Sequence, residues 1–333
     1  MAEATSRLKI DIEFAKKEIQ KANAKRVLIQ IPEGLKDRIT SMISELKEKC
    51  KDVEFFCAID PLYGACDLAE KEAGQIDADL VLHFGHSQII ESKKTVYVPV
   101  TYEISKKEIE KSVEKIIEYL QKNKISNITI GGTIQYMPYL QKIRQLLEKE
   151  NIKVNVGKTG LLKDGQILGC NINSLLFDSK TQLLVLFSDG QFHAKFAALV
   201  SKKKVIQVDL INAKIEEIKP DEKLVKKRIA AIMQAEKAES FGILICTKEG
   251  QFNIEKAIEI KKMVESKGKK AYLFTGDLLL PEYFLGINVD CFVSTACPRI
   301  VLDEFGKWKK PILNIEEVMI ALGVKKLEEY SLI

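Results

Sequence analysis

A repeat of about one hundred residues is the feature of this sequence that most restricts its fold. Three times, a short apolar and β-branched run ends in a glycine-bearing turn and leads into an amphipathic helical pattern, beginning at Arg26, Asn127 and Phe241. A later run of the same kind starts at residues 78, 181 and 289, which are 103 and 108 residues apart. A nearly constant period of this kind predicts one structural unit repeated along the chain.

Each repeat is predicted to supply four strands to one sheet. The second strands begin near residues 53, 153 and 270, and the fourth near 95, 204 and 311. Continuous apolar strands that alternate with helices indicate a parallel sheet covered on both faces. The predicted fold class is therefore α/β, with three similar lobes, each a short parallel sheet flanked by helices. The predicted lobes are 1–101, 102–210 and 211–333, and helices at about 102–124 and 221–238 join one lobe to the next.

Composition and charge exclude several classes of protein. The chain of 333 residues is 46% hydrophobic and 30% charged, as in an ordinary folded protein, and has no run of about 20 apolar residues that could span a membrane. Its first residues predict an amphipathic helix and not a signal peptide, so a cytoplasmic location is expected. The net charge is only +5, from 52 Lys and Arg against 47 Asp and Glu, and most lysines share a helix face with glutamates. This pattern does not favour direct nucleic-acid binding.

Parallel sheets place ligand chemistry beyond the carboxyl ends of their strands. After the first strands the sequence has Glu33-Gly34, Gly132-Thr133 and Glu249-Gly250, and after the third strands it has His86, His193 and Cys297 nearby. His83, the remaining histidine, lies within its strand and is expected to be packed there. The P-loop, the dinucleotide-binding glycine pattern, Gly-x-Ser-x-Gly and HExxH are all absent from the sequence.

Seven cysteines in a reducing compartment favour thiols and metal ligands over disulfides. Cys57, Cys246 and Cys291 lie inside apolar strands and are predicted to be core residues, and Cys50 ends a polar helix. The other three lie in loops or at strand ends beside small residues, one in each predicted lobe: Cys66, Cys170 and Cys297.

Three converging thiolates leave several metal sites open. A structural zinc site with His193 as the fourth ligand is one alternative, although the close cysteine pairs of zinc ribbons are absent. An iron–sulfur cluster held by three cysteines is the other, and its fourth iron would keep an open position for a substrate. Three unpaired cysteines without a metal are the remaining interpretation.

Several motifs, taken together and in order, resemble one known family. They are YGACDLAEKEA (63–73), LVLHFGHSQI (80–89), TIGGTIQY (129–136), DGQFHAKFAAL (189–199) and STACPRIVLDEFGKWKKPILNIEEV (294–318). This set is similar to the archaeal 2-(3-amino-3-carboxypropyl)histidine synthases, non-classical radical S-adenosylmethionine enzymes of the first step of diphthamide biosynthesis. The resemblance extends from about Arg26 to Val318.

The resemblance implies a cofactor, a reaction and a partner. A [4Fe–4S] cluster would be held by Cys66, Cys170 and Cys297, with the lobes arranged around it and S-adenosylmethionine against the fourth iron. Cleavage of the bond from the sulfonium to the methionine γ-carbon would give a 3-amino-3-carboxypropyl radical, which attacks C2 of a histidine in translation elongation factor 2. A reductant for the cluster and a homodimer are also implied.

Further site residues are expected at the strand ends. We expect catalytic contacts from Glu33, His86 and His193, and cofactor contacts from Gly34, Gly132, Thr133, Gly190, Gln191 and Arg299. The guanidinium of Arg299 could pair with the substrate carboxylate, or form an ordinary salt bridge. For Glu33 and Gln191, capping of the following helix is the structural alternative.

Two rival interpretations remain. The first is another three-lobed, three-cysteine iron–sulfur enzyme, such as quinolinate synthase or the last reductase of the methylerythritol phosphate pathway. The second is a non-catalytic partner that binds a cluster or zinc in support of another protein.

Overall fold

The computed structural model describes residues 7–330, which form two compact units. The first unit comprises the chain up to Ala198 together with Lys203–Ile218, and the second comprises Leu199–Lys202 and the chain from Lys219 onward. No helix in residues 7–330 is long and apolar enough to cross a membrane.

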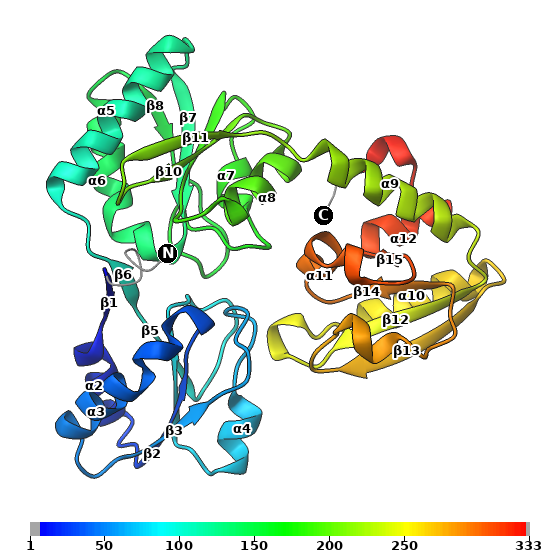
Figure 1. Cartoon of the computed structure of the whole chain (residues 1–333), viewed down its shortest axis with the longest axis horizontal. Helices are drawn as coiled ribbons and strands as arrows, with labels where there is room; N and C mark the ends of the chain where they lie inside the picture. The colour runs from blue at the N-terminus through cyan, green and yellow to red at the C-terminus, as the bar shows by residue number, and fades with distance from the viewer. Residues whose placement is uncertain (1–6, 331–333) are drawn as a thin grey trace. The chain divides into compact units, whose positions relative to one another are not determined.

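The first unit begins with a parallel sheet of order β3-β2-β4-β5. Helices α2 and α3 cover one face of this sheet and α4 covers the other (Figure 1). The elements are β2 (Arg26–Gln30), η1 (Glu33–Arg38), α3 (Ile39–Lys49), β3 (Glu54–Ala58), α4 (Glu70–Gln75), β4 (Leu80–Phe84) and β5 (Thr95–Val98), preceded by α2 (Ile12–Lys21).

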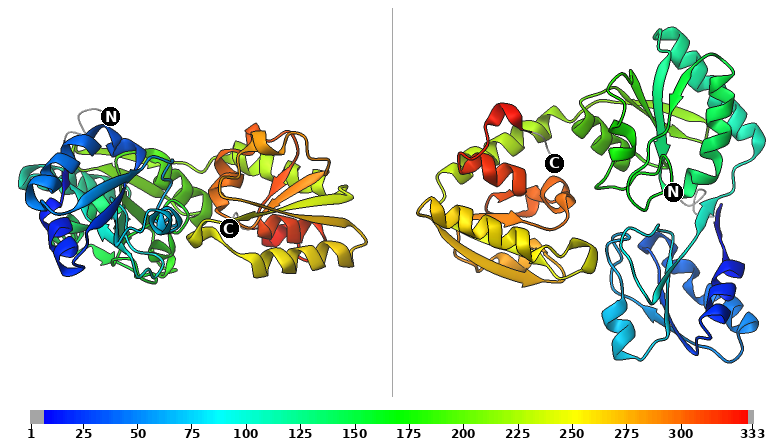
Figure 2. Two further views of the ribbon diagram at one scale, coloured as in Figure 1. Left: turned by 90° about the horizontal axis from the view of Figure 1, so that it is seen from below. Right: turned by 180° about the vertical axis from the view of Figure 1, so that it is seen from behind.

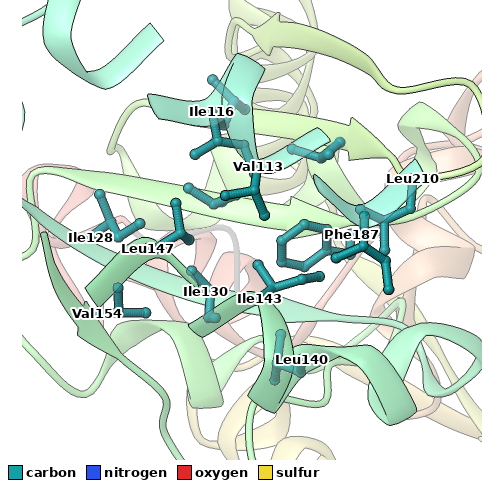
Figure 3. Close-up of a cluster of buried hydrophobic side chains, with 14 of the residues drawn as sticks. Val113, Ile116, Ile128, Ile130, Leu140, Ile143, Leu147, Val154, Phe187 and Leu210 are labelled. Atoms are coloured by element: carbon teal, nitrogen blue, oxygen red, sulfur yellow. The ribbon is translucent and has the colours of Figure 1, made fainter. Parts of the chain in front are cut away.

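A second sheet in the same unit has the order β11-β10-β9-β7-β8. The side chains of β7, β9 and β10 that point to α5 and α6 form a large apolar cluster with those helices (Figure 3). The elements are α5 (Lys106–Lys122), β7 (Asn127–Gly132), η2 (Ile134–Tyr136), α6 (Met137–Glu148), β8 (Lys153–Asn155), α7 (Asn173–Leu176), β9 (Leu183–Phe187), α8 (Gln191–Ser201), β10 (Val205–Asp209) and β11 (Lys214–Ile218).

Helix α5 shows why these segments are helical. Ser105 accepts a hydrogen bond from the backbone N–H of Glu108, and the Glu108 side chain accepts one from the Ser105 backbone, which closes a capping box. Buried Ile109, Val113, Ile116 and Leu120 then recur every three or four residues and form the face that packs on the sheet.

The second unit contains a parallel sheet of order β13-β12-β14-β15. Helices α9, α10 and α12 cover one face of this sheet, and α11 covers the other. Both views in Figure 2 show α10 lying along β12 and β13. The elements are α9 (Glu222–Glu236), β12 (Ser240–Cys246), η3 (Glu249–Gln251), α10 (Ile254–Ser266), β13 (Lys270–Gly276), η4 (Pro281–Phe284), β14 (Cys291–Ser294), α11 (Pro298–Asp303), η5 (Phe305–Lys307), β15 (Ile312–Leu313), α12 (Ile315–Ala321) and η6 (Leu327–Glu329).

The same strand order occurs in all three sheets. If the strands of each repeat are numbered along the chain, every sheet reads second, first, third, fourth, and all these pairs are parallel. Each predicted strand segment contains a strand of the structure, and the predicted fold class of short parallel sheets flanked by helices is confirmed. The lobe boundaries at 101/102 and 210/211 stay a proposal.

Two antiparallel pairings were not predicted from the sequence. Strand β1 (Leu8–Ile10), which lies in the N-terminal stretch predicted to be an amphipathic helix, pairs with β6 (Val100–Tyr102). Strand β11 returns along β10 in a hairpin. The Asp209 carboxylate accepts hydrogen bonds from the backbone N–H groups of Ile211 and Asn212, and Ala213 has a φ of 47°, so local turn chemistry reverses the chain.

A buried ion pair joins three elements of the second unit. The Nε and Nη2 atoms of Arg228 on α9 donate to the two carboxylate oxygens of Glu317 on α12, at 2.8 and 2.5 Å. A further Arg228 bond at 2.6 Å ends on the carbonyl of Ile312 in β15, and both charged side chains are almost fully buried. Because removing either partner would leave a buried charge alone, this pair holds α9 and α12 together on the sheet.

Candidate active site

A chain of buried polar side chains connects the loop that carries Cys66 with His86. The Gln30 side chain, at the carboxyl end of β2, donates to the carbonyl of Asp67 at 2.8 Å and accepts from the N–H of Ala69 at 3.2 Å. Its oxygen also lies 2.8 Å from Nδ1 of His83, and Nε2 of His83 lies 2.8 Å from Nδ1 of His86. Three side chains therefore link the 64–69 loop to the turn after β4.

Both imidazoles of this chain are held neutral by their surroundings. Burial, with a smaller effect from neighbouring His86, lowers the pKa of His83 to about 3. Burial also lowers the pKa of His86 to about 4. Near neutral pH each ring therefore carries one proton, on one of its two nitrogens.

The turn after β4 also contacts the second sheet of the first unit. The Ser87 hydroxyl donates to the side-chain oxygen of Gln166 at 3.0 Å, and Nε2 of Gln135 donates to the carbonyl of Gly85 at 3.1 Å. Gly85 has a φ of +79° and packs close to Pro32, so its position favours glycine. The segment 85–87 is thus fixed between the Cys66 loop and the loop that contains Gln166.

Gln166 and Cys170 belong to one irregular loop that is fastened to the end of β7. The N–H of Gly132 donates to the carbonyl of Gly165, and its carbonyl accepts from the N–H of Ile167, both at 3.0 Å. The predicted cofactor contact from the Gly132 amide is therefore an amide already engaged within the protein. The backbone of Gly132 also lies so close to Phe187 that an added Cβ would meet its carbonyl at 2.8 Å.

The DGQFH segment approaches the same loop from α8. A Cβ on Gly169, next to Cys170, would lie 2.7 Å from the ring of Phe192, so this ring covers Gly169. The rings of Phe192 and His193 meet edge to face with their centroids 5.0 Å apart. Partly buried His193 thus lies within one residue of a side chain that touches the Cys170 loop.

Other predicted contacts in this unit have protein partners. The N–H of Thr133 donates to the carbonyl of Phe187 at 3.1 Å, and the carbonyl of Gly190 accepts from Ser188 at 2.8 Å. The side chain of Gln191 donates to Glu216 on β11, and its predicted contact with the cofactor stays a prediction.

Glu33 and Gly34 lie in the short helix η1 after β2. The Glu33 carboxylate is 2.5 Å from Nζ of Lys36 and is mostly exposed. An added Cβ on Gly34 would meet nothing within 4 Å, so packing does not require glycine there.

The second unit contributes Cys297 and Arg299. Cys297 directly precedes α11, and Thr295 ties this turn to β12 by donating from its hydroxyl to the carbonyl of Leu244 at 3.0 Å. Nε of Arg299 donates to the carboxylate of Asp303 at 2.7 Å, so the ordinary salt bridge that the sequence left open for Arg299 does form. Burial raises the pKa of Asp303 despite this neighbour.

The seven cysteines fall into two groups by their surroundings. Burial raises the pKa of the thiols of Cys50, Cys57 and Cys291, and Cys246 is buried with its thiol directed to the carbonyl of Asp277. Cys50, which the sequence left without neighbours, packs into the core beside α2 and α3. Cys57 is only partly buried, because β3 is an edge strand.

The chemistry of the other three thiols fits an iron–sulfur cluster better than that of the buried group. Cys66, Cys170 and Cys297 are all partly exposed and lie in loops past strand ends, where a soft metal can reach the sulfur. Cys66 and Cys170 belong to the first unit and Cys297 to the second. Within residues 7–330, no group of three or more His, Cys, Asp or Glu side chains is arranged to hold a metal ion.

Sequence reasoning missed the polar residues that position this site. Gln30 and Gln166 are almost fully buried, and each connects a cysteine-bearing loop to segment 83–87. A glutamine inside the apolar strand RVLIQI was a usable signal, since a buried amide needs hydrogen-bond partners. The position of Gln166 carried no such signal, because the loop around it has no regular pattern.

Comparison with known proteins gives a consistent result. Residues 31–331 match the family model described as putative diphthamide synthesis protein. The chain is 32% identical to the 2-(3-amino-3-carboxypropyl)histidine synthase of Pyrococcus horikoshii, over 95% of this chain and 90% of that protein. The protein of the same name from Methanocaldococcus jannaschii is 28% identical, over 96% of this chain and 91% of that one.

A solved structure is similar over almost the whole chain. The crystal structure of Dph2 from Pyrococcus horikoshii with a 4Fe–4S cluster has a TM-score of 0.86 and 30% sequence identity, and the match covers 97% of this chain and 93% of that chain. Subunit 1 of the synthase from Saccharomyces cerevisiae is 31% identical, over 91% of this chain and 72% of that subunit.

Proposed function

Because the chain belongs to the family of putative diphthamide synthesis proteins, we propose that it is a 2-(3-amino-3-carboxypropyl)histidine synthase. It would transfer the 3-amino-3-carboxypropyl group of S-adenosylmethionine to C2 of a histidine in translation elongation factor 2. The observation that carries this proposal is the likeness, over 97% of the chain, to a protein solved with a 4Fe–4S cluster.

Cys66, Cys170 and Cys297 are the proposed cluster ligands. Their partial exposure separates them from the buried cysteines, and each lies in a different repeat of the sequence. When bound, such a cluster supplies one electron to S-adenosylmethionine, whose sulfonium–γ-carbon bond then breaks to give methylthioadenosine and a 3-amino-3-carboxypropyl radical. Three protein ligands leave one iron open for that substrate.

The protein residues would bind and orient the substrates. Arg299 is partly buried two residues after Cys297, and its guanidinium has the geometry to take a carboxylate in place of Asp303. His86 and His193 flank the Cys170 loop through Ser87 and Phe192. The space beside Gly190 is open, since an added Cβ would meet no atom within 4 Å.

The same proposal includes the setting of the reaction. A reductant must feed the cluster, and a reducing cytosol keeps the three thiols available as ligands. The rival interpretations, a small-molecule iron–sulfur enzyme or a non-catalytic partner, predict that S-adenosylmethionine is not cleaved.

We also propose that two copies of the chain associate through strand β13. Strand β13 is the longest edge strand of the three parallel sheets in the described residues. Its residues 271–276 are uncharged, whereas edge strand β11 contains three charged residues. Tyr272 and Leu273 are exposed, at 46% and 39%. An uncharged, exposed edge pairs readily with a second strand, and a two-fold antiparallel pair centred on Leu273 brings no like charges together.

The association is tested by Leu273→Lys. Light scattering should report a change from dimer to monomer, because a lysine at the centre would face its own copy. Val324→Lys, another exposed apolar position outside this edge, is the matched control. A dimer that survives Leu273→Lys places the interface elsewhere.

The activity is tested with protein purified and reconstituted without oxygen. After reduction with dithionite, we expect methylthioadenosine from S-adenosylmethionine, and we expect the alanine variants of Cys66, Cys170 and Cys297 to lose both this product and most of the bound iron. Cys57→Ser is the control, since that thiol is also partly exposed but lies in a strand. A fully loaded protein that gives no nucleoside product, or only deoxyadenosine, contradicts the proposal.

A further inference from the structure

The hydrogen bonds around Gln30 determine which of its side-chain atoms is which. The carbonyl of Asp67 can only accept and the N–H of Ala69 can only donate. The amide nitrogen of Gln30 must therefore face Asp67, and its oxygen must face Ala69. The same oxygen lies 2.8 Å from Nδ1 of His83, so the proton between them sits on His83.

The proton position on His83 in turn determines the proton position on His86. A neutral His83 with its proton on Nδ1 has only a lone pair on Nε2, and that lone pair faces Nδ1 of His86 at 2.8 Å. Nδ1 of His86 must then carry the proton. In a neutral ring this leaves the remaining nitrogen, Nε2, without one.

The neutral state that this reasoning needs follows from burial. His83 is fully buried, and its ring lies against Tyr97 and His86. The groups hydrogen-bonded to it are the Gln30 amide and a second imidazole, and no carboxylate among residues 7–330 is hydrogen-bonded to either ring. Burial therefore keeps the pKa of both rings well below neutral pH, as described above.

In the part of the chain that the structure describes, Nε2 of His86 has no hydrogen-bond partner. Among residues 7–330 the hydrogen bonds of His86 account for Nδ1 alone. The ring of His86 is held through Nδ1 by His83. Its backbone is held by the next residue, Ser87, whose hydroxyl donates to Gln166 in the Cys170 loop. A rigid acceptor without a partner at the carboxyl edge of a parallel sheet is suited to a ligand.

We propose that Gln30 and His83 are positioning residues that lock His86 with its proton on Nδ1, so that its Nε2 accepts a hydrogen bond from an N–H group of a ligand. A lone pair attracts an ammonium or an imidazole N–H and repels a carboxylate. Under the proposed function, on which this inference rests, the candidate donors are the α-ammonium of S-adenosylmethionine and the ring N–H of the histidine to be modified. The carboxylate of S-adenosylmethionine would bind elsewhere.

The proposed tautomer of His86 is tested first by a measurement that does not depend on enzymatic activity. The sequence has three histidines, so a chain labelled with ¹⁵N-histidine has few ring nitrogens, and single His→Phe variants assign them. In the full-length protein at neutral pH, long-range proton–nitrogen spectra should show Nδ1 protonated and Nε2 bare in both His83 and His86. A proton on Nε2 of His86 would overturn the proposal, whether or not the protein cleaves S-adenosylmethionine.

Two variants test the origin of the lock. His83→Phe and Gln30→Leu remove the two links, and His86 should then become a mixture of both tautomers. Ser87→Ala, which changes the same turn but not the chain of bonds, should leave Nδ1 of His86 protonated. If the first two variants do not fold, the wild-type spectrum still shows which nitrogen of His86 carries the proton.

Binding measurements identify the donor. His86→Ala in the reconstituted protein should weaken S-adenosylmethionine binding about tenfold or more, the usual loss for a hydrogen bond to a charged group. An analogue that lacks the α-ammonium should bind both proteins equally, and His86→Gln, which offers a carbonyl oxygen, should recover part of the loss. If S-adenosylmethionine binding is unchanged but KM for the elongation factor rises, the acceptor histidine is the donor. No change in either refutes the proposal.

Discussion

At the scale of single residues, the glycines at the end of β7 are set by close packing. A Cβ on Gly131 would lie 2.4 Å from the carbonyl of Gly165 and 2.7 Å from the Leu175 side chain. The Cys170 loop thus approaches the sheet more closely than any side chain allows. The sequence motif GGT predicted a ligand contact at this place, and the structure gives at least Gly131 a purely structural reason.

Gly131→Ala is therefore expected to destabilise the protein by about 1–3 kcal/mol, because a methyl group must push backbone aside. Urea unfolding followed by circular dichroism measures the effect. Gly74→Ala is the control: it lies in α4 with nothing within 4 Å of an added Cβ, and alanine should stabilise that helix by about 0.5–1 kcal/mol. Equal effects at the two sites would contradict this packing argument.

The pair His83 and His86 predicts how stability depends on pH. In the unfolded chain both titrate near about 6.5, and in the folded protein their pKa values are about 3 and about 4. Below about pH 6.5 the unfolded state binds more protons, so folding stability falls as pH falls, by up to about 1.4 kcal/mol per pH unit for each ring. Melting temperatures at pH 7.5 and 5.5 measure this loss, and a His83→Phe, His86→Phe double variant should lose less than the wild type.

At the scale of elements, strands were more predictable than their neighbours. A parallel strand buried on both faces is a run of apolar residues, and every such run predicted here contains a strand. Strands β1 and β11 escaped prediction, since β1 has three residues and β11 mixes Ile215 with charges because one face meets solvent. The three predicted ligand cysteines differ from partly buried Cys57 in lying outside the strands, which their sequence setting indicated. The glutamines that position their loops depend on tertiary contacts that no local pattern encodes.

The ion pair between α9 and α12 gives a prediction at this scale. Glu317→Gln should destabilise the protein by about 3–5 kcal/mol, since Arg228 would remain charged and buried without its partner. Glu265→Gln removes the exposed partner of Lys261 and should cost less than about 1 kcal/mol. Chemical denaturation measures the unfolding free energy of both variants. Similar losses of stability in the two would contradict this prediction.

At the scale of the whole molecule, the second unit has what an independent domain needs. Residues 219–330 contain a complete four-stranded sheet, an apolar cluster on each of its faces and the Arg228–Glu317 pair. We expect residues 219–333 expressed alone to fold. A cooperative thermal transition and dispersed amide spectra would agree with this, whereas a disordered fragment would not.

The pairing of β1 with β6 has a consequence for how this chain could be rebuilt. Leu8 lies opposite Tyr102, so the peptide enters and leaves the first sheet at neighbouring points of one ladder. Residues 8–102 thus form a segment whose first and last residues are neighbours on paired strands. Because its ends are adjacent, such a segment could be exchanged between relatives, or replaced by another domain with adjacent ends, at the same two positions of the chain.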